Sequence, residues 1–295
     1  MIVILGATGA TGSALLARLV ALGAPCRALT RTPDRLRDTL AEMSCTQVEV
    51  RHVDATDPAS LRAAFAGGTQ LFLTMTNSPA QIELESRAIT IAADSGIEHI
   101  VKLSAPTASP DSSVAVARWH HAIEEVLRGT GVPHTLLRPY AFMQKLSHLA
   151  PAVAAQDVIV GAMGDTACNY IDCRDIGDVA AEAFTRPEIA GHTYTLTGAR
   201  TFNYPELAAL LSALLDRHIR YIDVPPAAFR QTNIERAGMP DWLADHIMEI
   251  QQLAVTHPEQ PTDTVARILG RAPRTMESFL TEHLDIFRPK LRGRS

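Results

Sequence analysis

Three glycines near the start of the chain are spaced in a way that suits phosphate binding. Gly6, Gly9 and Gly12 follow the apolar run Ile2–Leu5 and open an amphipathic stretch. Glycine permits a tight turn, lets backbone amides approach a pyrophosphate, and allows a helix to pack closely on a strand. The first amides of that helix would face the phosphates. This context predicts a dinucleotide site formed by Gly6, Thr8, Gly9, Ala10, Thr11 and Gly12.

The residues after the second and third predicted strands indicate which dinucleotide to expect. An acidic side chain after the second strand would bond a ribose 2′-hydroxyl and repel a 2′-phosphate. The chain has Arg31 there, whose guanidinium can pair with a phosphate, so we expect NADP(H) in preference to NAD(H). An ordinary exposed arginine is the alternative. Asp54 could accept a bond from the adenine amino group, and Asp57 is expected to cap a helix beginning at Pro58. The other cofactor residues expected in this part of the chain are Ala55 and Thr74.

Short apolar runs alternate with helical patterns through the first half of the chain. The strand-like segments are 2–5, 26–30, 47–53, 71–75, 99–103 and 135–137. The helix-like segments between them are 13–22, 33–43, 58–65, 79–95 and 116–129. Alternation at this spacing predicts a parallel sheet with helices on both faces and right-handed crossovers. We therefore expect an α/β fold built on a Rossmann-type, doubly wound parallel sheet.

The second half is less regular and predicts a smaller, mostly helical C-terminal lobe. Its strand-like segments are 158–160, 170–171, 193–196 and 219–224. Its helical segments are 176–184 and 205–215, with further helical stretches up to about residue 287. The expected organisation is an NAD(P)-binding core in residues 1–150, followed by a mixed segment, 151–295, that completes the core and forms a substrate lobe.

Composition argues against several classes of protein. Apolar residues make up 46% of the 295 residues and the formal net charge is −5, which suits a globular protein and disfavours nucleic acid as a partner. No metal-ligand spacing is present, so we expect no metal site. The cysteines expected to be small buried or half-buried thiols are Cys26, Cys45, Cys168 and Cys173. With no visible signal peptide and no apolar run of about 20 residues, we expect a cytoplasmic protein without membrane spans. A homodimer is compatible with the sequence, which leaves the oligomeric state open.

Several further motifs resemble the NmrA-like branch of the atypical short-chain dehydrogenase/reductases. The glycine motif alone is generic to that superfamily, whereas the combination covers essentially the whole chain. The matching segments are 6–12, Thr30-Arg31, Val53-Asp54-Ala55, His120-x-x-x-Glu124 with Leu127-Arg128, 135–139 with Phe142-Met143, Tyr170-Ile171-Asp172 with Asp175-Ile176, Thr262-Asp263, and Phe279. The resemblance implies an NAD(P)-binding core with a substrate cleft beside a smaller lobe. Members of the family include quinone and azo-type reductases, other small-molecule reductases, and redox-sensing regulators without turnover.

The resemblance also indicates which catalytic groups are present. Ordinary members of the superfamily use a Ser, a Tyr and a Lys, with the Tyr four residues before the Lys and a Glu four residues after it. Matching that Glu to Glu124 puts His120 at the Lys position and Val116 at the Tyr position. Ser104 matches the Ser. The resemblance therefore implies that the usual proton donor is missing, because valine cannot supply a proton.

The expected catalytic residues are His120, Ser104 and Tyr140. We expect His120, on a helix surface facing the cleft, to contact the nicotinamide ribose or the substrate, and Ser104 to polarise the substrate oxygen. A partly buried histidine without a catalytic role is the alternative. Tyr140 follows the sixth strand, where it could replace the missing donor or simply line the pocket. The cofactor residues expected around this end of the site are His120, Pro139 and Phe142.

Three functions are compatible with these residues. The favoured one is NADPH-dependent reduction of an electrophilic small molecule, such as a quinone or enone, by direct hydride transfer. Such acceptors delocalise the developing negative charge and tolerate a weak or absent acid. The second is a non-catalytic NAD(P)-sensing regulator that acts through a partner protein, and the third is a redox-neutral isomerase or cyclase. NADPH oxidation with an acceptor would separate the first from the second, whereas activity without added nicotinamide would indicate the third.

Overall fold

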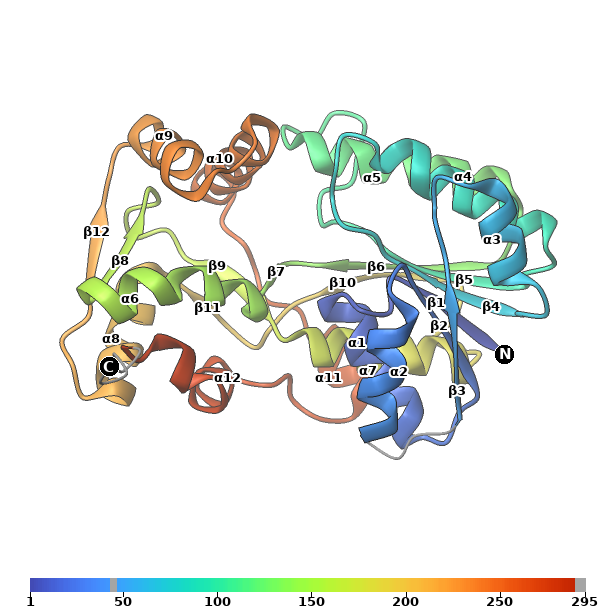
Figure 1. The fold of residues 1–295 in the computed structure, drawn as a ribbon. Helices are drawn as coiled ribbons and strands as arrows, with labels where there is room; N and C mark the ends of the chain where they lie inside the picture. The colour runs from blue at the N-terminus through green and yellow to red at the C-terminus, as the bar shows by residue number, and fades with distance from the viewer. Residues whose placement is uncertain (43–46, 290–295) are drawn as a thin grey trace.

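The computed structural model describes residues 1–42 and 47–289, and a seven-stranded parallel sheet forms its centre (Figure 1). Its strands are β1 (Ile2–Leu5), β2 (Cys26–Thr30), β3 (Val48–His52), β4 (Gln70–Leu73), β5 (His99–Leu103), β6 (His134–Pro139) and β10 (Thr193–Leu196). The strand order is β10-β6-β5-β4-β1-β2-β3, which reverses between β1 and β4. In such sheets, ligands bind outside the carboxyl ends of the strands at the point of reversal. The predicted Rossmann-type fold is confirmed.

Helices cover both faces of this sheet (Figure 1). One face carries α3 (Pro58–Phe65), α4 (Gln81–Asp94) and α5 (Ala115–Gly129). The other carries α1 (Ala10–Ala21), α2 (Pro33–Glu42), α7 (Cys173–Thr185) and α11 (Thr264–Leu269). Fully buried apolar side chains fill each layer, such as Leu61 and Ile89 on the first face and Leu15 and Ile176 on the second. This burial of apolar surface holds the strand ends, and hence the candidate site, in place.

Local sequence decides where the helices beside the site begin. The Asp57 carboxylate accepts a hydrogen bond from Ala59 N at 2.8 Å, so the predicted cap of α3 is confirmed. Asp172 caps α7 in the same way, through Arg174 N at 2.8 Å. Gly9 stands at the cap position of α1 and has no side chain to offer. The first amides of α1 therefore need another acceptor, which a bound anion can supply.

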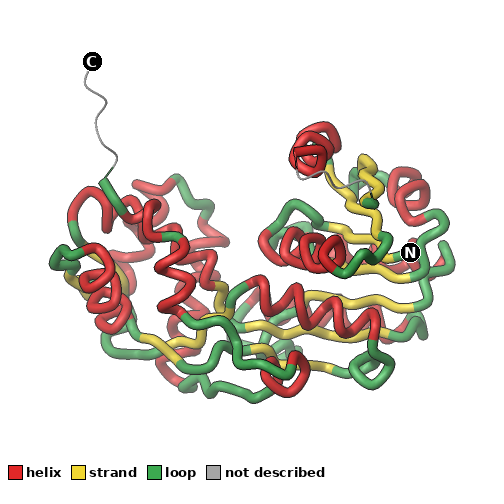
Figure 2. Tube along the Cα trace, turned by 90° about the horizontal axis from the view of Figure 1, so that it is seen from below, coloured by secondary structure: helices red, strands yellow, loops and turns green. Residues whose placement is uncertain are grey.

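A second lobe, formed mainly by the C-terminal half, has its own core and consists mostly of helices (Figure 2). Its helices are η1 (Met143–Leu149), α6 (Ala150–Gln156), α8 (Tyr204–Leu215), α9 (Pro226–Ala237), α10 (Asp241–Thr256), α12 (Met276–Glu282) and η2 (Leu284–Phe287). Its strands are β7 (Ala141–Phe142), β8 (Val158–Gly161), β9 (Cys168–Ile171), β11 (Thr201–Phe202) and β12 (Arg220–Asp223), arranged as the small sheets β11-β9-β7 and β12-β8. The predicted helical lobe thus also contains two small sheets. The first of them continues directly from the end of β6, which connects it to the carboxyl edge of the main sheet.

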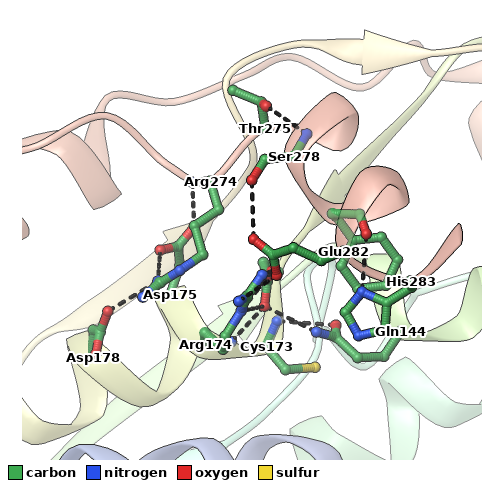
Figure 3. A network of polar contacts seen from close by, with 12 residues as sticks. Gln144, Cys173, Arg174, Asp175, Asp178, Arg274, Thr275, Ser278, Glu282 and His283 are labelled. Carbon is green, nitrogen blue, oxygen red and sulfur yellow. Dashed lines mark hydrogen bonds and ion pairs between the residues drawn. The ribbon is translucent and has the colours of Figure 1, made fainter. Parts of the chain in front are cut away.

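A buried aspartate fixes the connection between the core and the second lobe near the C-terminus. Helix α11 packs against the core and α12 packs in the second lobe, so the chain between them crosses from one to the other. Asp175, which has no exposed surface, accepts hydrogen bonds from Arg271 Nη2 at 2.7 Å and Arg274 N at 2.7 Å. Arg174, on the same helix as Asp175, pairs with Glu282 of α12 at 2.7 Å (Figure 3). Helix α7 therefore holds both ends of the crossing segment.

Within residues 1–42 and 47–289, no helix is long and apolar enough to cross a lipid bilayer. The same part of the chain contains no cluster of three or more His, Cys, Asp or Glu side chains that could hold a metal ion. Cys26, Cys168 and Cys173 are buried, as predicted, and Cys45 lies outside the described residues.

Candidate cofactor and substrate site

A cleft of about 2310 Å³ runs along the carboxyl ends of the sheet strands, between the core and the second lobe. Its lining begins at the glycine loop, passes the ends of β2 to β6, and reaches α9 and α10. Pockets for drug-sized ligands are roughly 300–1,000 Å³. The cleft therefore has room for a dinucleotide and for a second molecule beside it.

The glycines of the loop occupy three different environments. Gly6 has a φ of +94°, and a Cβ there would lie 2.2 Å from the carbonyl oxygen of Thr74. A Cβ on Gly12 would lie 2.1 Å from the carbonyl oxygen of Gly6, so α1 packs this closely on the loop only with glycine at that position. At Gly9, a Cβ would meet the Gly6 oxygen at 3.4 Å and nothing nearer. Gly6 and Gly12 shape the loop, whereas Gly9 leaves space for a ligand. The predicted loop residues that line the cleft are Gly6, Thr8, Gly9, Ala10 and Thr11, and Gly12 lies behind them.

Arg31 and Asp54 lie at the ends of neighbouring strands on one side of the cleft. Arg31 is exposed and makes no hydrogen bond or ion pair with the other described residues, so its guanidinium is available to a phosphate. Asp54 Oδ1 accepts bonds from Thr56 N at 2.9 Å and Thr56 Oγ1 at 2.7 Å, which lower the pKa of Asp54. Its other carboxylate oxygen takes no part in these bonds. The predicted residues Ala55 and Thr74 line the cleft as well.

His120 is buried in a network of polar side chains from three different elements. The expected surface position is wrong, because His120 is 6% exposed, although it does line the cleft. Lys102 Nζ lies 2.9 Å from His120 Nδ1 and 3.0 Å from Glu85 Oε2, and all three residues are buried. His120 Nε2 faces Gln81 Nε2 at 3.4 Å.

Burial, together with the Lys102 ammonium, holds the pKa of His120 well below its ordinary value. Because the Lys102 ammonium can only donate, a ligand can bond to Nδ1 of His120 only if this network rearranges. The feature of the sequence that could have predicted this network is Lys102, a lysine within the otherwise apolar end of β5.

Ser104 is also committed to a neighbouring side chain. Ser104 Oγ donates a hydrogen bond of 2.6 Å to Glu124 Oε1, and both residues are buried. Arg138 Nε donates to the same oxygen at 3.1 Å. Burial raises the pKa of Glu124, but the hydrogen bonds from Arg138 and Ser104 lower it more, so this pKa lies below its ordinary value. Ser104 lines the cleft, but its proton is directed at Glu124, so it is not free to polarise a substrate oxygen in this arrangement.

The remaining predicted residues lie where β6 leads into the second lobe. Val116, which the resemblance matches to a tyrosine, is 2% exposed and lines the cleft beside His120. Tyr140 is partly buried in the cleft wall, and burial raises the pKa of its hydroxyl, with a further contribution from Glu259. The other predicted cofactor residues on this wall are Pro139 and Phe142. The structure therefore brings all the predicted catalytic residues to one cleft.

The second lobe contributes an apolar wall that sequence patterns did not reveal. Trp242 of α10 lies 6.0 Å from Trp119 of α5, between ring centroids, which brings the lobe against the core helix. Glu249 Oε2 accepts a hydrogen bond of 2.8 Å from Ala115 N at the same contact. His246 lines the cleft nearby, and burial lowers its pKa to about 4. The apolar lining from this lobe includes Phe229, Met239, Trp242, Leu243, Ile247 and Ile250.

The fold, the glycine loop and the long cleft define an α/β dinucleotide-binding protein with space for a second ligand. A family model described as the NmrA-like family matches residues 1–280, and the chain belongs to that family. It is 31% identical over 288 residues to an NAD(P)H azoreductase from Xenophilus azovorans, covering 97% of this chain and 99% of the relative. It is also 31% identical over 292 residues to a (4-alkanoyl-5-oxo-2,5-dihydrofuran-3-yl)methyl phosphate reductase from Streptomyces griseus, covering 98% and 100%.

A solved structure has the same fold as this chain. The chain superimposes on the NADPH-dependent quinone oxidoreductase from Escherichia coli, complexed with NADPH, with a TM-score of 0.85. The two sequences are 25% identical, and the match covers 97% of this chain and 100% of the other. The core and the second lobe together therefore match the whole length of that solved chain.

Proposed function

We propose that this protein is an NADPH-dependent reductase of an electrophilic small molecule, such as a quinone or an enone. The observation that carries the proposal is the continuity of one cleft, from the glycine loop and Arg31 at one end to the apolar wall of α9 and α10 at the other. A bound dinucleotide would supply a hydride, and the second space would hold the acceptor. The reductases among its relatives support an oxidoreductase of this kind.

The residues present fit NADP(H). Gly9 leaves the space that a pyrophosphate needs, and the uncapped start of α1 presents amides to it. Arg31 supplies a guanidinium where an acidic residue would repel the 2′-phosphate. Asp54 stands at the end of the next strand, where it can accept from the adenine amino group. The same cofactor occurs in the solved relative from Escherichia coli, which is complexed with NADPH.

The residues at the three catalytic positions matched from sequence offer no free proton, which favours an acceptor that needs little help from them. Val116 has no proton to give, and the proton of Ser104 is directed at Glu124. His120 is held by Lys102 with its pKa well below the ordinary value, because it is buried. A quinone or conjugated enone spreads the charge of the added hydride over several atoms. The wide apolar wall would suit the ring surface of such a molecule.

Within this proposal, the two parts of the chain have separate tasks. The carboxyl ends of the core strands hold the cofactor, and β10 completes the sheet. The second lobe, which begins at β7, builds the wall that selects the acceptor. Ser104, His120 and Tyr140 border the place where cofactor and acceptor would meet.

Titration of both dinucleotides against wild type and Arg31→Ala tests the cofactor assignment. We expect NADPH to bind more tightly than NADH, and Arg31→Ala to weaken NADPH binding by roughly ten- to a hundredfold, the value of a lost charge-assisted bond to phosphate. NADH binding should change little in the same variant. Equal affinities for the two dinucleotides in wild type would exclude the assignment.

Steady-state reduction of a panel of quinones, enones and azo dyes tests the activity. NADPH oxidation that depends on an acceptor, and that a glycine-loop variant abolishes, is the expected result. Tight NADPH binding without turnover of any acceptor would instead favour a cofactor-sensing regulator.

A further inference from the structure

Glu259 stands in the cleft wall next to Tyr140, on a segment that crosses from the second lobe to the core. The segment follows α10 and is held at both ends: His257 N donates to Leu253 O at 2.8 Å, and Thr262 N donates to Thr197 Oγ1 at 2.8 Å. Figure 1 shows the chain leaving α10 and running past β9 and β7 toward α11. This segment passes close to the end of β6.

The position of the Glu259 carboxyl is fixed by a backbone amide. Asn169 N donates a hydrogen bond of 2.5 Å to Glu259 Oε2, and Asn169 is itself fully buried. In the small sheet, Ala141 of β7 pairs with Tyr170 of β9. Continuing that parallel register by one residue places Tyr140 beside Asn169. Glu259 is therefore a neighbour of the residue that follows β6 in the cleft.

This place is the end of the cleft where hydride transfer would occur. Arg31 lies past β2, so a dinucleotide whose 2′-phosphate it binds extends across β1 and β4 toward the ends of β5 and β6. Those ends carry Ser104 and Tyr140. Glu259 lines the same cleft beyond them. No Arg or Lys in the described part of the chain forms an ion pair with it, so no cation compensates its charge.

We propose that Glu259, in its protonated form, donates a hydrogen bond to the oxygen of the bound acceptor and gives up this proton when the acceptor is reduced. The inference rests on the proposed reductase function. Reduction of a quinone consumes one hydride and one proton: the hydride comes from the reduced nicotinamide, which becomes oxidised, and the O–H bond of Glu259 breaks as an O–H bond forms on the acceptor. The products are the hydroquinone and the Glu259 carboxylate, which Asn169 N stabilises until water returns the proton.

The electrostatic surroundings support a carboxyl that is protonated near neutral pH. Burial raises the pKa of Glu259 to about 7, although the bond from Asn169 N opposes this. The titratable groups that face it are Tyr140, Cys168 and Tyr170. Burial raises the pKa of all three, that of Cys168 to about 12, so none of them titrates near neutral pH. The exposed His257 lies two residues earlier on the same segment and also lines the cleft.

Binding of a small quinone, 1,4-naphthoquinone, to the complex with NADP⁺ tests the inference without turnover. The chain has two tryptophans, and Trp119 and Trp242 lie together beside the cleft, so quenching of their fluorescence can report binding. For wild type, we expect affinity to fall about tenfold between about pH 6 and about pH 8.5, the value of one hydrogen bond that requires a protonated carboxyl. For Glu259→Gln, we expect no change over this range, because the amide still accepts from Asn169 N but does not titrate.

Two control variants show whether the pH dependence belongs to the Glu259 carboxyl itself. Glu249→Gln alters another carboxylate that accepts a backbone N–H, at the contact of α10 with α5, and should keep the wild-type pH dependence. His257→Gln removes the exposed histidine on the same segment and should keep the wild-type midpoint. A midpoint that moves with His257→Gln, or wild-type binding that is flat with pH, would overturn the inference.

Turnover provides the second readout. We expect Glu259→Gln to reduce NADPH-dependent quinone reduction at about pH 6 by roughly ten- to a hundredfold, at or below the lower end of the range for a lost general acid. Unchanged turnover with an unchanged pH profile would exclude proton transfer from Glu259 while leaving the reductase function intact. Absence of NADPH oxidation in wild type would instead exclude the reductase function, and the binding titration would still decide whether Glu259 contacts the acceptor.

Discussion

At the scale of single residues, the buried group Lys102, Glu85 and His120 has the clearest consequence for stability. We expect His120→Ala to lower the free energy of unfolding by about 1–3 kcal/mol, because the buried Lys102 ammonium loses a hydrogen-bond acceptor. Urea denaturation measures this effect. The neighbouring His121→Ala, which removes a half-buried side chain outside the network, serves as the control and should change it by less than about 0.5 kcal/mol. Equal free energies of unfolding for wild type and His120→Ala would show that the Lys102–His120 contact does not stabilise the fold.

A second residue-scale prediction concerns the pH dependence of stability. The pKa of Glu259 is about 7 in the folded protein, against an ordinary value of 4.5, so the unfolded chain loses this proton first as the pH rises. As the pH rises from 4.5 to about 7, the free energy of unfolding therefore falls, and it stays at the lower value above this range. Since glutamine has no charge to desolvate, Glu259→Gln should be more stable than wild type by on the order of 2 kcal/mol at about pH 8, and about equal to it near pH 4. Thermal unfolding at both pH values measures the difference, and a difference independent of pH would contradict the assignment.

At the scale of elements, one glycine of the loop is needed for folding and another for cofactor binding. A Cβ on Gly12 would lie 2.1 Å from the Gly6 oxygen, so Gly12→Ala should displace α1 and lower the free energy of unfolding by about 1–3 kcal/mol. Gly9→Val should leave the fold intact but weaken NADPH binding by at least about a hundredfold, because its side chain would enter the space for the pyrophosphate. Gly129→Ala, where a Cβ meets nothing within 4 Å, is the matched control. Calorimetric NADPH titration and circular dichroism distinguish these effects, and NADPH binding retained in Gly9→Val would rule out the loop as the phosphate site.

At the scale of the whole molecule, the crossing segments determine how the lobe stands against the core. Asp175 holds the connection between α11 and α12 through Arg271 and Arg274. We expect Asp175→Asn to cost about 2–4 kcal/mol and to speed tryptic cleavage after these arginines, since an amide has one acceptor oxygen where the buried carboxylate has two, and only Asp178 then pairs with both guanidinium groups. Glu188→Gln breaks an exposed pair with Arg186 and should cost less than about 1 kcal/mol. Tryptic cleavage as slow in Asp175→Asn as in wild type would show that the lobe is held by other contacts.

The sequence by itself determined the local features of this protein. The strand, glycine loop and helix at the start of the chain, the Asp57 cap and the alternation of apolar runs all depend on neighbours in sequence, and they were predicted within a few residues. The same reasoning placed Arg31 at the end of β2, because strand ends on one edge of a parallel sheet can be located from the runs themselves.

Only the tertiary structure decided which side chains are free to act. Burial of His120 depends on Lys102 and Glu85 from two other elements, and Ser104 is held by Glu124 from a third. Glu259 stands beside Tyr140 only because a crossing segment meets the small sheet β11-β9-β7. Hydrogen bonding and desolvation between residues far apart in sequence leave no periodic pattern in the chain, and these two effects decide whether a side chain can give or take a proton.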